Sequence, residues 1–427
     1  MRIIGYILTL LISLQALAQS DLTITGTIID EKSGEPLAFA TVGIKGSPHG
    51  TISNPDGQFS FFIPSKYLQD TLTISHVGFE SSKWRIEDAI NKSLNITLKE
   101  SITILEEVLV NGDKLTAKQI MKRALEKLGD NYSENAFIAS GFFRDIREQN
   151  QKTVYLVEAA VDIEDPGYKM AGSRPKKFFL KGVRASDSRV NGLLRRSLLN
   201  AGNSLTVNLE RNFWLNRLRH ELARSEFSIT EILNKDDRIL YSIETEKVTA
   251  ISPLADHHSH MEFTLTHRYL VDAETYAIYK VEHIETPHES EYIGIEPPYE
   301  GDSLFYSKKG WNQVIEFEEY QGKMFLKYHD VVYAFDIVDE KNNLVHLDMK
   351  YQFVFTVTDI KTGKTAKPAD EKMNKNKPLL IQAQSYDSEF WTNPANAKLV
   401  PLTRKQLNDL AEERPLEEQF RSKKTLR

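Results

Sequence analysis

The sequence predicts a mainly β, α+β protein in which a small β-sandwich precedes a larger domain with a helix and an antiparallel β-meander. Three observations lead to this fold class. Short alternating apolar and polar runs, separated by turn residues, fill residues 24–98, which is the pattern of a small sandwich. A helical spacing of apolar residues begins after residue 116. Alternating runs return over 238–360, as in an antiparallel sheet with one buried and one wet face.

Length and composition exclude several classes of function. The 427 residues are enough for two or three domains, and the 41% hydrophobic and 27% charged residues are ordinary for a soluble globular protein. A net charge of −6 argues against a nucleic-acid partner, which needs a basic face. Cysteine is absent, so disulfides, thiol nucleophiles, Cys-ligated zinc and lipid attachment at an N-terminal cysteine are excluded.

Residues 1–18 have the pattern of a secretory signal peptide. Arg2 precedes an apolar run at 3–14, and the small residues Ala16 and Ala18 fit a cleavage site. The run is shorter than the ~20 residues of a spanning helix, and the alternative is an uncleaved membrane anchor. We expect cleavage after Ala18, export to the periplasm or the outer membrane, and no transmembrane helix in the mature chain.

A tight turn is predicted inside the sandwich at Asn54, Pro55, Asp56 and Gly57. Pro55 presets φ for the first central position, Asp56 tolerates the second, and Gly57 takes a positive φ. We interpret these four residues as structural, because they join two alternating runs.

The residues around this turn resemble a known family, the carboxypeptidase regulatory-like domain. The resemblance implies a seven-stranded, transthyretin-like sandwich over 22–99 with no catalysis of its own. Such domains also stand at the front of outer-membrane receptors in Gram-negative bacteria, where a strand like 105–110 leads into a plug. No plug-like sequence follows here, and 100–115 is expected to be a linker strand. The matching pieces are Thr25–Ile28, Asp30, Gly34–Leu37, Ala40–Val42, Ile44–Gly46, Gly50–Thr51, Asp56–Phe59 and Ser75–Phe79.

The second domain, expected over 116–360, begins with a capped helix. The Thr116 hydroxyl and Gln119 form a capping box pattern. A second helical spacing surrounds Trp214. Its basic residues could meet lipid phosphate or form a solvated helix face; they are Arg211, Arg217, Arg219 and Arg224.

The meander carries two predicted hairpin turns, at 272–275 and 320–323. The segment 268–276 is similar to a strand-turn-strand of lipoprotein-carrier half-barrels, in which a curved sheet wraps helices and can hold acyl chains. The inward aromatic residues are therefore either a ligand face or plain core. They are Phe263, Tyr269, Phe353 and Phe355.

The C-terminal part is expected to contain a lysine-rich loop at 361–378 and a segment at 379–427 that packs on the second domain. Thr403 to Glu413 is a predicted helix with Leu407 and Leu410 inward.

Three motifs for catalysis or phosphate binding are incomplete. Ser303 stands in a lipase-like Gly-Asp-Ser-Leu, but neither downstream histidine has Asp three residues before it. His288 and Glu291 have a zinc-peptidase spacing without the sequence that surrounds such pairs. Gly363 and the two residues after it lack the first glycine of a phosphate-binding loop.

A histidine cluster at His257, His258 and His260 is a weak candidate for a transition-metal site, and an exposed loop is the simpler interpretation. We expect no cofactor. The sequence thus favours an exported, non-enzymatic envelope protein that binds or scaffolds at the outer membrane, with an outer-membrane protein or a lipid as partner. The alternatives are a carrier of a lipid or another hydrophobic ligand, an accessory component of an outer-membrane receptor system, and a hydrolase.

Overall fold

A computed structural model gives the fold of the chain. It describes residues 22–101, 115–168, 175–190, 205, 209, 213–235, 238–245, 248–253, 260–287, 292–293, 304–339, 344–363, 367–369, 371–382, 386–393 and 400–422. The expected signal peptide and most of the expected linker strand lie outside these residues.

The N-terminal domain is a sandwich of seven strands, as the resemblance implies. One sheet has the order β4-β1-β7 and the other the order β3-β2-β5-β6. Ile28, Phe61 and Ile74 belong to the core between them. The strands are β1 (Thr23–Asp30), β2 (Thr41–Ile44), β3 (Gly50–Ile52), β4 (Gln58–Phe62), β5 (Thr71–Ser75), β6 (Ser82–Arg85) and β7 (Ser93–Leu98), with η1 (Ser65–Tyr67) and α2 (Ile86–Ala89) between them.

The turn before β4 is held by the side chain of Asn54. Its Oδ1 accepts hydrogen bonds from the backbone N–H groups of Asp56 and Gln58, at 3.0 and 2.8 Å. Gly57 has φ +72°, and its N–H donates to the Asn54 carbonyl. The Gly57 carbonyl in turn accepts from the N–H of Ile28 on β1, so the turn is fastened to the three-stranded sheet.

The second domain is built on one large antiparallel sheet, thirteen strands within the described residues, in the order β11-β12-β14-β15-β17-β18-β19-β8-β9-β10-β20 with β13 and β16 beside this path. The strands are β8 (Phe137–Gln149), β9 (Lys152–Asp165), β10 (Lys177–Ala185), β11 (Phe227–Lys235), β12 (Arg238–Thr245), β13 (Val248–Pro253), β14 (His260–Asp272), β15 (Ile278–Pro287), β16 (Tyr292–Ile293), β17 (Leu304–Tyr320), β18 (Lys323–Asp339), β19 (Leu344–Thr362) and β20 (Glu371–Lys372).

Turn chemistry sets the hairpins of this sheet. Asp272 Oδ1 accepts from the N–H groups of Glu274 and Thr275 between β14 and β15. Gln321 and Gly322 have φ +52° and +72° between β17 and β18, the two positive values of a type I′ turn. Both predicted hairpin turns therefore join neighbouring strands.

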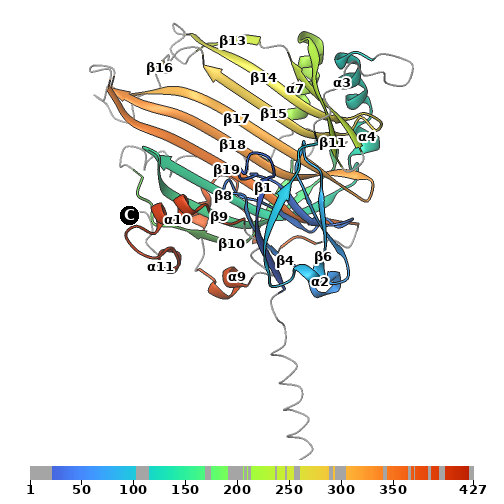
Figure 1. Cartoon of the computed structure of the whole chain (residues 1–427). Coiled ribbons are helices and arrows are strands. Elements are labelled where there is room, and N and C mark those ends of the chain that lie inside the picture. The colour runs from blue at the N-terminus through green and yellow to red at the C-terminus, as the bar shows by residue number, and fades with distance from the viewer. Residues whose placement is uncertain are drawn as a thin grey trace, which may run out of the picture.

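The cross-strand register defines an inner face. Residues directly opposite one another in a sheet point to the same side. One such row runs across eight strands: Tyr269, Val281, Ile315, His329, Phe355, Phe143, Ala159 and Val183. We call the side of this row the inner face. Two helices cover its β11–β15 end, α3 (Ala117–Glu126) and α7 (Phe213–Arg224), with the short α4 (Leu128–Asn131) beside them (Figure 1). The capping box of Thr116 and Gln119 begins α3, as expected.

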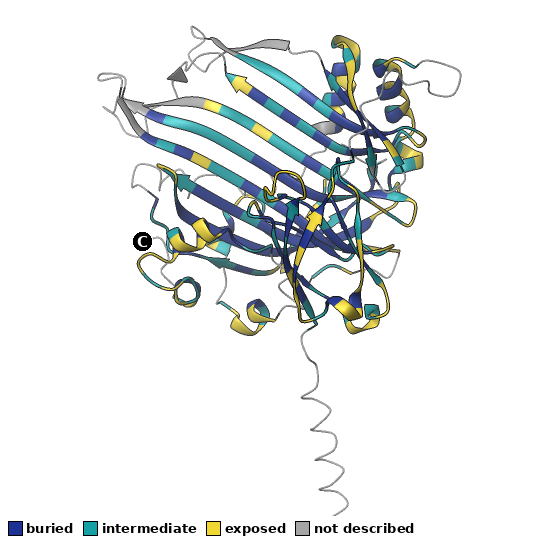
Figure 2. Ribbon diagram, in the orientation of Figure 1, coloured by how far each residue is buried: buried dark blue, intermediate teal, exposed yellow. Residues whose placement is uncertain are grey.

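The outer face holds the sandwich. Phe39 stacks on Tyr328 of β18, with 5.0 Å between ring centroids. His49 Nδ1 lies 3.3 Å from the carbonyl of Thr358 on β19. Figure 1 shows the sandwich lying across the strands of the sheet, and Figure 2 shows buried residues, in dark blue, alternating with less buried ones along those strands.

The last three C-terminal helices also pack on the outer face, whereas Leu379 of the first one belongs to a core of the inner face. Trp391 lies 6.3 Å from Phe142 of β8, ring to ring, and Leu410 packs with Ile146 of the same strand. The helices are α8 (Leu379–Gln382), α9 (Ser388–Thr392), α10 (Arg404–Leu410) and α11 (Leu416–Arg421).

Two expectations differ from the structure. Leu407 is 43% exposed rather than inward, because Gln406 and Leu410 form the buried face of α10. The stretch 361–378 is not simply a loop, because it contains β20, an edge strand paired with β10. β8 pairs with β19, and this pairing joins the strands that follow α4 and the meander in one sheet.

We predict that Gly57→Ala destabilises the protein more than Gly34→Ala. Both glycines have φ +72°, so both substitutions bear the cost of about 1–2 kcal/mol for a left-handed residue. A Cβ at Gly57 would also overlap the carbonyl oxygen of Ile28, whereas nothing lies within 4 Å at Gly34. Urea unfolding of both variants measures the difference. Equal losses of stability would show that the close approach to β1 is absent.

Candidate functional site

The proposed ligand face is mostly filled by the protein itself. Tyr269 and Phe355 are 0% and 1% exposed, Phe353 is 9% exposed, and Phe263 is partly exposed. Tyr269 packs beneath α7, and its hydroxyl donates to Glu221 Oε2 at 2.7 Å. Burial raises the pKa of Tyr269 well above its usual range, so this hydroxyl keeps its proton. Tyr269, Phe353 and Phe355 therefore belong to hydrophobic cores.

A chain of polar side chains lies inside this core. His267 Nδ1 is 2.7 Å from Glu221 Oε1, and His267 Nε2 is 2.5 Å from His283 Nδ1. Arg217 Nη1 lies 3.0 Å from both of the latter nitrogens. The basic residues of α7 are therefore not one solvated face: Arg219 and Arg224 are exposed, whereas Arg217 turns to the histidines.

This row of polar side chains continues from His283 toward β17. His283 Nε2 is 3.8 Å from Glu285 Oε2, and the His283 ring lies 4.3 Å from that of Trp311. Burial lowers the pKa of His283 to about 4, with Arg217 and His267 adding to this effect and Glu285 opposing it. The ring is thus neutral at pH 7. The short contacts join Glu221, His267 and His283, whereas the distance from His283 to Glu285 is longer than a hydrogen bond.

Sequence reasoning missed this carboxylate–imidazole–imidazole–carboxylate chain. The two histidines are sixteen residues apart in the sequence but directly opposed across β14 and β15. A usable signal existed, because His267 stands two residues before Tyr269 at an inward position of an alternating strand. A polar residue at such a position predicts a buried partner.

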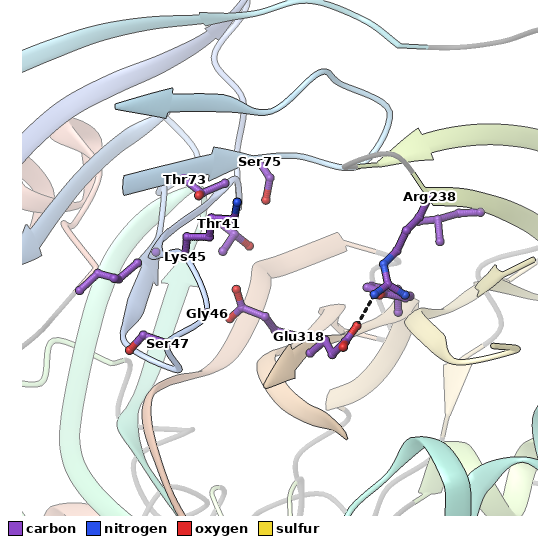
Figure 3. Close-up of a pocket in the computed structure, with 13 residues that line it drawn as sticks. Thr41, Lys45, Gly46, Ser47, Thr73, Ser75, Arg238 and Glu318 are labelled. Carbon is purple, nitrogen blue, oxygen red and sulfur yellow. Dashed lines mark hydrogen bonds and ion pairs between the residues drawn. The ribbon is translucent and has the colours of Figure 1, made fainter. Parts of the chain in front are cut away.

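A second feature is a polar cleft between the two domains, shown in Figure 3. Its volume is about 390 Å³. One wall comes from β2, β5 and the loop after β2, and the other from β12, β15 and β17. The residues that line it are Thr41, Gly43, Ile44, Lys45, Gly46, Ser47, Thr73, Ser75, Arg238, Leu240, Tyr279, Glu318 and Glu319.

The candidate residues for metal binding and catalysis fall mostly outside the described residues. His257, His258, His288, Glu291 and Ser303 lie there. His260 begins β14, and its side chain is not among those described. Gly363 follows β19 with φ +97°. Within the part of the chain that the structure describes, no group of three or more His, Asp or Glu residues is placed to hold a metal ion.

Comparison with known proteins confirms the resemblance of the first domain. Residues 24–110 match the CarboxypepD_reg-like domain family. A stretch of 101 residues, 24% of this chain, is 34% identical to the TonB-dependent receptor SusC of Bacteroides thetaiotaomicron. The chain spans 9% of the length of that receptor, so the match concerns this region alone.

Solved structures that are similar to part of the chain have low sequence identity to it and low TM-scores. A putative outer membrane lipoprotein-sorting protein domain from Vibrio parahaemolyticus covers 59% of this chain and 95% of its own, with 10% identity and a TM-score of 0.25. A LolA superfamily protein from Nitrosomonas europaea covers 59% and 96%, with 13% identity and a TM-score of 0.20. TM-scores this low carry no argument about function. No helix among the described residues has the length and apolar character that crossing a membrane requires.

We predict that the free energy of unfolding rises between pH 4 and pH 6.5. Burial holds the pKa of His283 at about 4 and that of His329 at about 3, below the ordinary 6.5. The unfolded chain therefore binds more protons in this window, and stability is lost as the pH falls. Burial raises the pKa of Asp330 to about 6, which acts in the opposite direction.

Two variants, studied by urea unfolding at several pH values, test the parts that His283 and Asp330 have in this pH dependence. His283→Gln should make the free energy of unfolding rise less with pH, and Asp330→Asn should make it rise more. An unchanged pH profile in His283→Gln would contradict the buried, neutral state of this ring.

Proposed function

We propose that the protein is an exported, non-enzymatic envelope protein that binds or scaffolds at the outer membrane. Its partner would be an outer-membrane protein or a lipid surface. In this proposal the large sheet is a rigid platform, and the sandwich is a module fixed to its outer face.

The filled inner face is the observation that supports a scaffold over a carrier. Side chains from eight strands meet in one row there, and α3, α7 and the residues Leu205 and Leu209 pack into the same cores. Well-packed interiors leave few voids larger than a water molecule. A lipid chain would have to displace protein side chains at Tyr269 and Phe355.

An envelope location has two supports. The charge, apolar run and small residues of positions 1–18 fit export. The first domain resembles part of a TonB-dependent receptor, which fits an accessory role beside such a receptor.

The carrier stays as a second candidate because of partly exposed aromatic rings. Trp311, Tyr333 and Tyr351 lie opposite one another on neighbouring strands of the inner face and are only partly buried. Such rings could contact an acyl chain near one end of the sheet.

We predict that protein purified from the envelope fraction carries no phospholipid or fatty acid at near one molecule per chain. Native mass spectrometry measures the bound mass, and the same spectrum shows whether residues 1–18 are absent. A lipid at near one per chain, displaced by Tyr333→Glu but not by Glu389→Gln on the exposed α9, would favour the carrier. A chain that retains Met1 in the inner membrane would contradict export.

A further inference from the structure

The cleft between the domains has several polar side chains in its lining. Its wall on the sandwich side carries three hydroxyl groups on two paired strands. Thr41 of β2 lies opposite Ser75 of β5, and Thr73 lies opposite Gly43. Thr73 Oγ1 is buried, and within the described residues none of the three hydroxyls has a protein hydrogen-bond partner. Leaving a buried hydroxyl unpaired costs about 1–3 kcal/mol, so this wall is complementary to a polar molecule.

Gly43 leaves the floor of the cleft open. A Cβ built there would lie 3.4 Å from the carbonyl oxygen of His49 and 3.9 Å from Glu318 Oε1. A side chain at this position would therefore enter the space between the walls without overlapping the backbone.

The opposite wall, on the outer face of the large sheet, carries charges that are already matched. Arg238 Nη2 donates to Glu319 Oε2 at 2.7 Å, and Arg238 Nη1 lies 3.4 Å from Asp272 Oδ2. Glu318 Oε2 lies 3.0 Å from Lys327 Nζ. Figure 3 shows Arg238 and Glu318 on this side, facing Thr41, Thr73 and Ser75 across the cleft. Lys45 stands at the exposed rim.

The side chains that line the cleft favour one class of ligand over others. A buried ion needs an opposite charge, but the carboxylates and cations of the wall formed by the large sheet already neutralise one another. An apolar ligand would leave three hydroxyls unpaired. An uncharged molecule with several hydroxyl groups can both donate to the carboxylates and accept from the guanidinium, and it can pair with Thr41, Thr73 and Ser75. Leu240 and Tyr279 give it an apolar surface for its carbon skeleton.

We propose that this cleft binds a small uncharged polyhydroxyl compound, a mono- or disaccharide. The volume of about 390 Å³ lies within the range of small-molecule sites. This proposal goes beyond the proposed function, and its failure would leave that function standing.

Saturation-transfer NMR on the full chain tests the proposal with four probes of similar chemistry. Glucose and maltose are the uncharged probes, and glucuronate and glucosamine are their anionic and cationic counterparts. We expect transfer to at least one uncharged probe, with weaker binding of the charged ones. The double substitution Thr73→Val, Ser75→Ala should weaken binding by about tenfold or more, as the loss of one or two hydrogen bonds does.

Two further variants control the interpretation. Thr97→Val changes an exposed threonine of β7 on the other sheet and should leave binding unchanged. Gly43→Ala narrows the cleft with little strain and should also weaken binding, which keeps the test valid if the double variant does not fold. Absence of transfer to both uncharged probes would overturn the proposal. So would tighter binding of a charged probe, or unchanged binding in both folded cleft variants.

Discussion

The antiparallel pairing of β8 with β19 is the contact on which the rest of the second domain depends. It runs from Met349 opposite Gln149 to Thr362 opposite Phe137. It joins the first strands of the domain to the last strand of the meander, which lies about two hundred residues later. Without this pairing, β19 would be an open edge and the domain would be two smaller sheets. With it, one continuous sheet has an inner face and an outer face, and every other element packs on one of them.

The two faces have different chemistry. The inner face is mostly apolar, and α3 and α7 cover its β11–β15 end. Buried polar groups interrupt it, among them the Glu221–His267–His283–Glu285 group, His329 and the Asp145–Arg147 ion pair. The outer face carries ion pairs such as Arg268 with Glu282, and it receives the sandwich and the helices α9, α10 and α11. The hydrogen bond from the Arg404 N–H to Asp56 Oδ2 links α10 to the turn of the sandwich, so the two parts that cover the outer face also contact each other.

The sequence predicted those structural features that depend on interactions between residues close together in the chain. The cap at Thr116, the hairpin turns at 272–275 and 320–323, and the alternation of the strands follow from short-range chemistry, and the structure has them. Pairing across long distances does not follow, because alternation says which face a residue takes and not which strand lies beside it. The histidine chain and the cleft are both made of such long-range neighbours: Thr73 and Glu318 share one cavity from two different domains.

The cleft exists, and the sheet can act as a platform for the sandwich, only if the sandwich is fixed to the outer face of the sheet. A double-mutant cycle with Phe39→Leu and Tyr328→Leu, followed by urea unfolding, tests this contact directly. We expect one cooperative transition and a coupling energy of about 0.5–1.5 kcal/mol, as for a stacked aromatic pair. Additive effects of the two substitutions, together with separate unfolding of the sandwich, would contradict the docked structure.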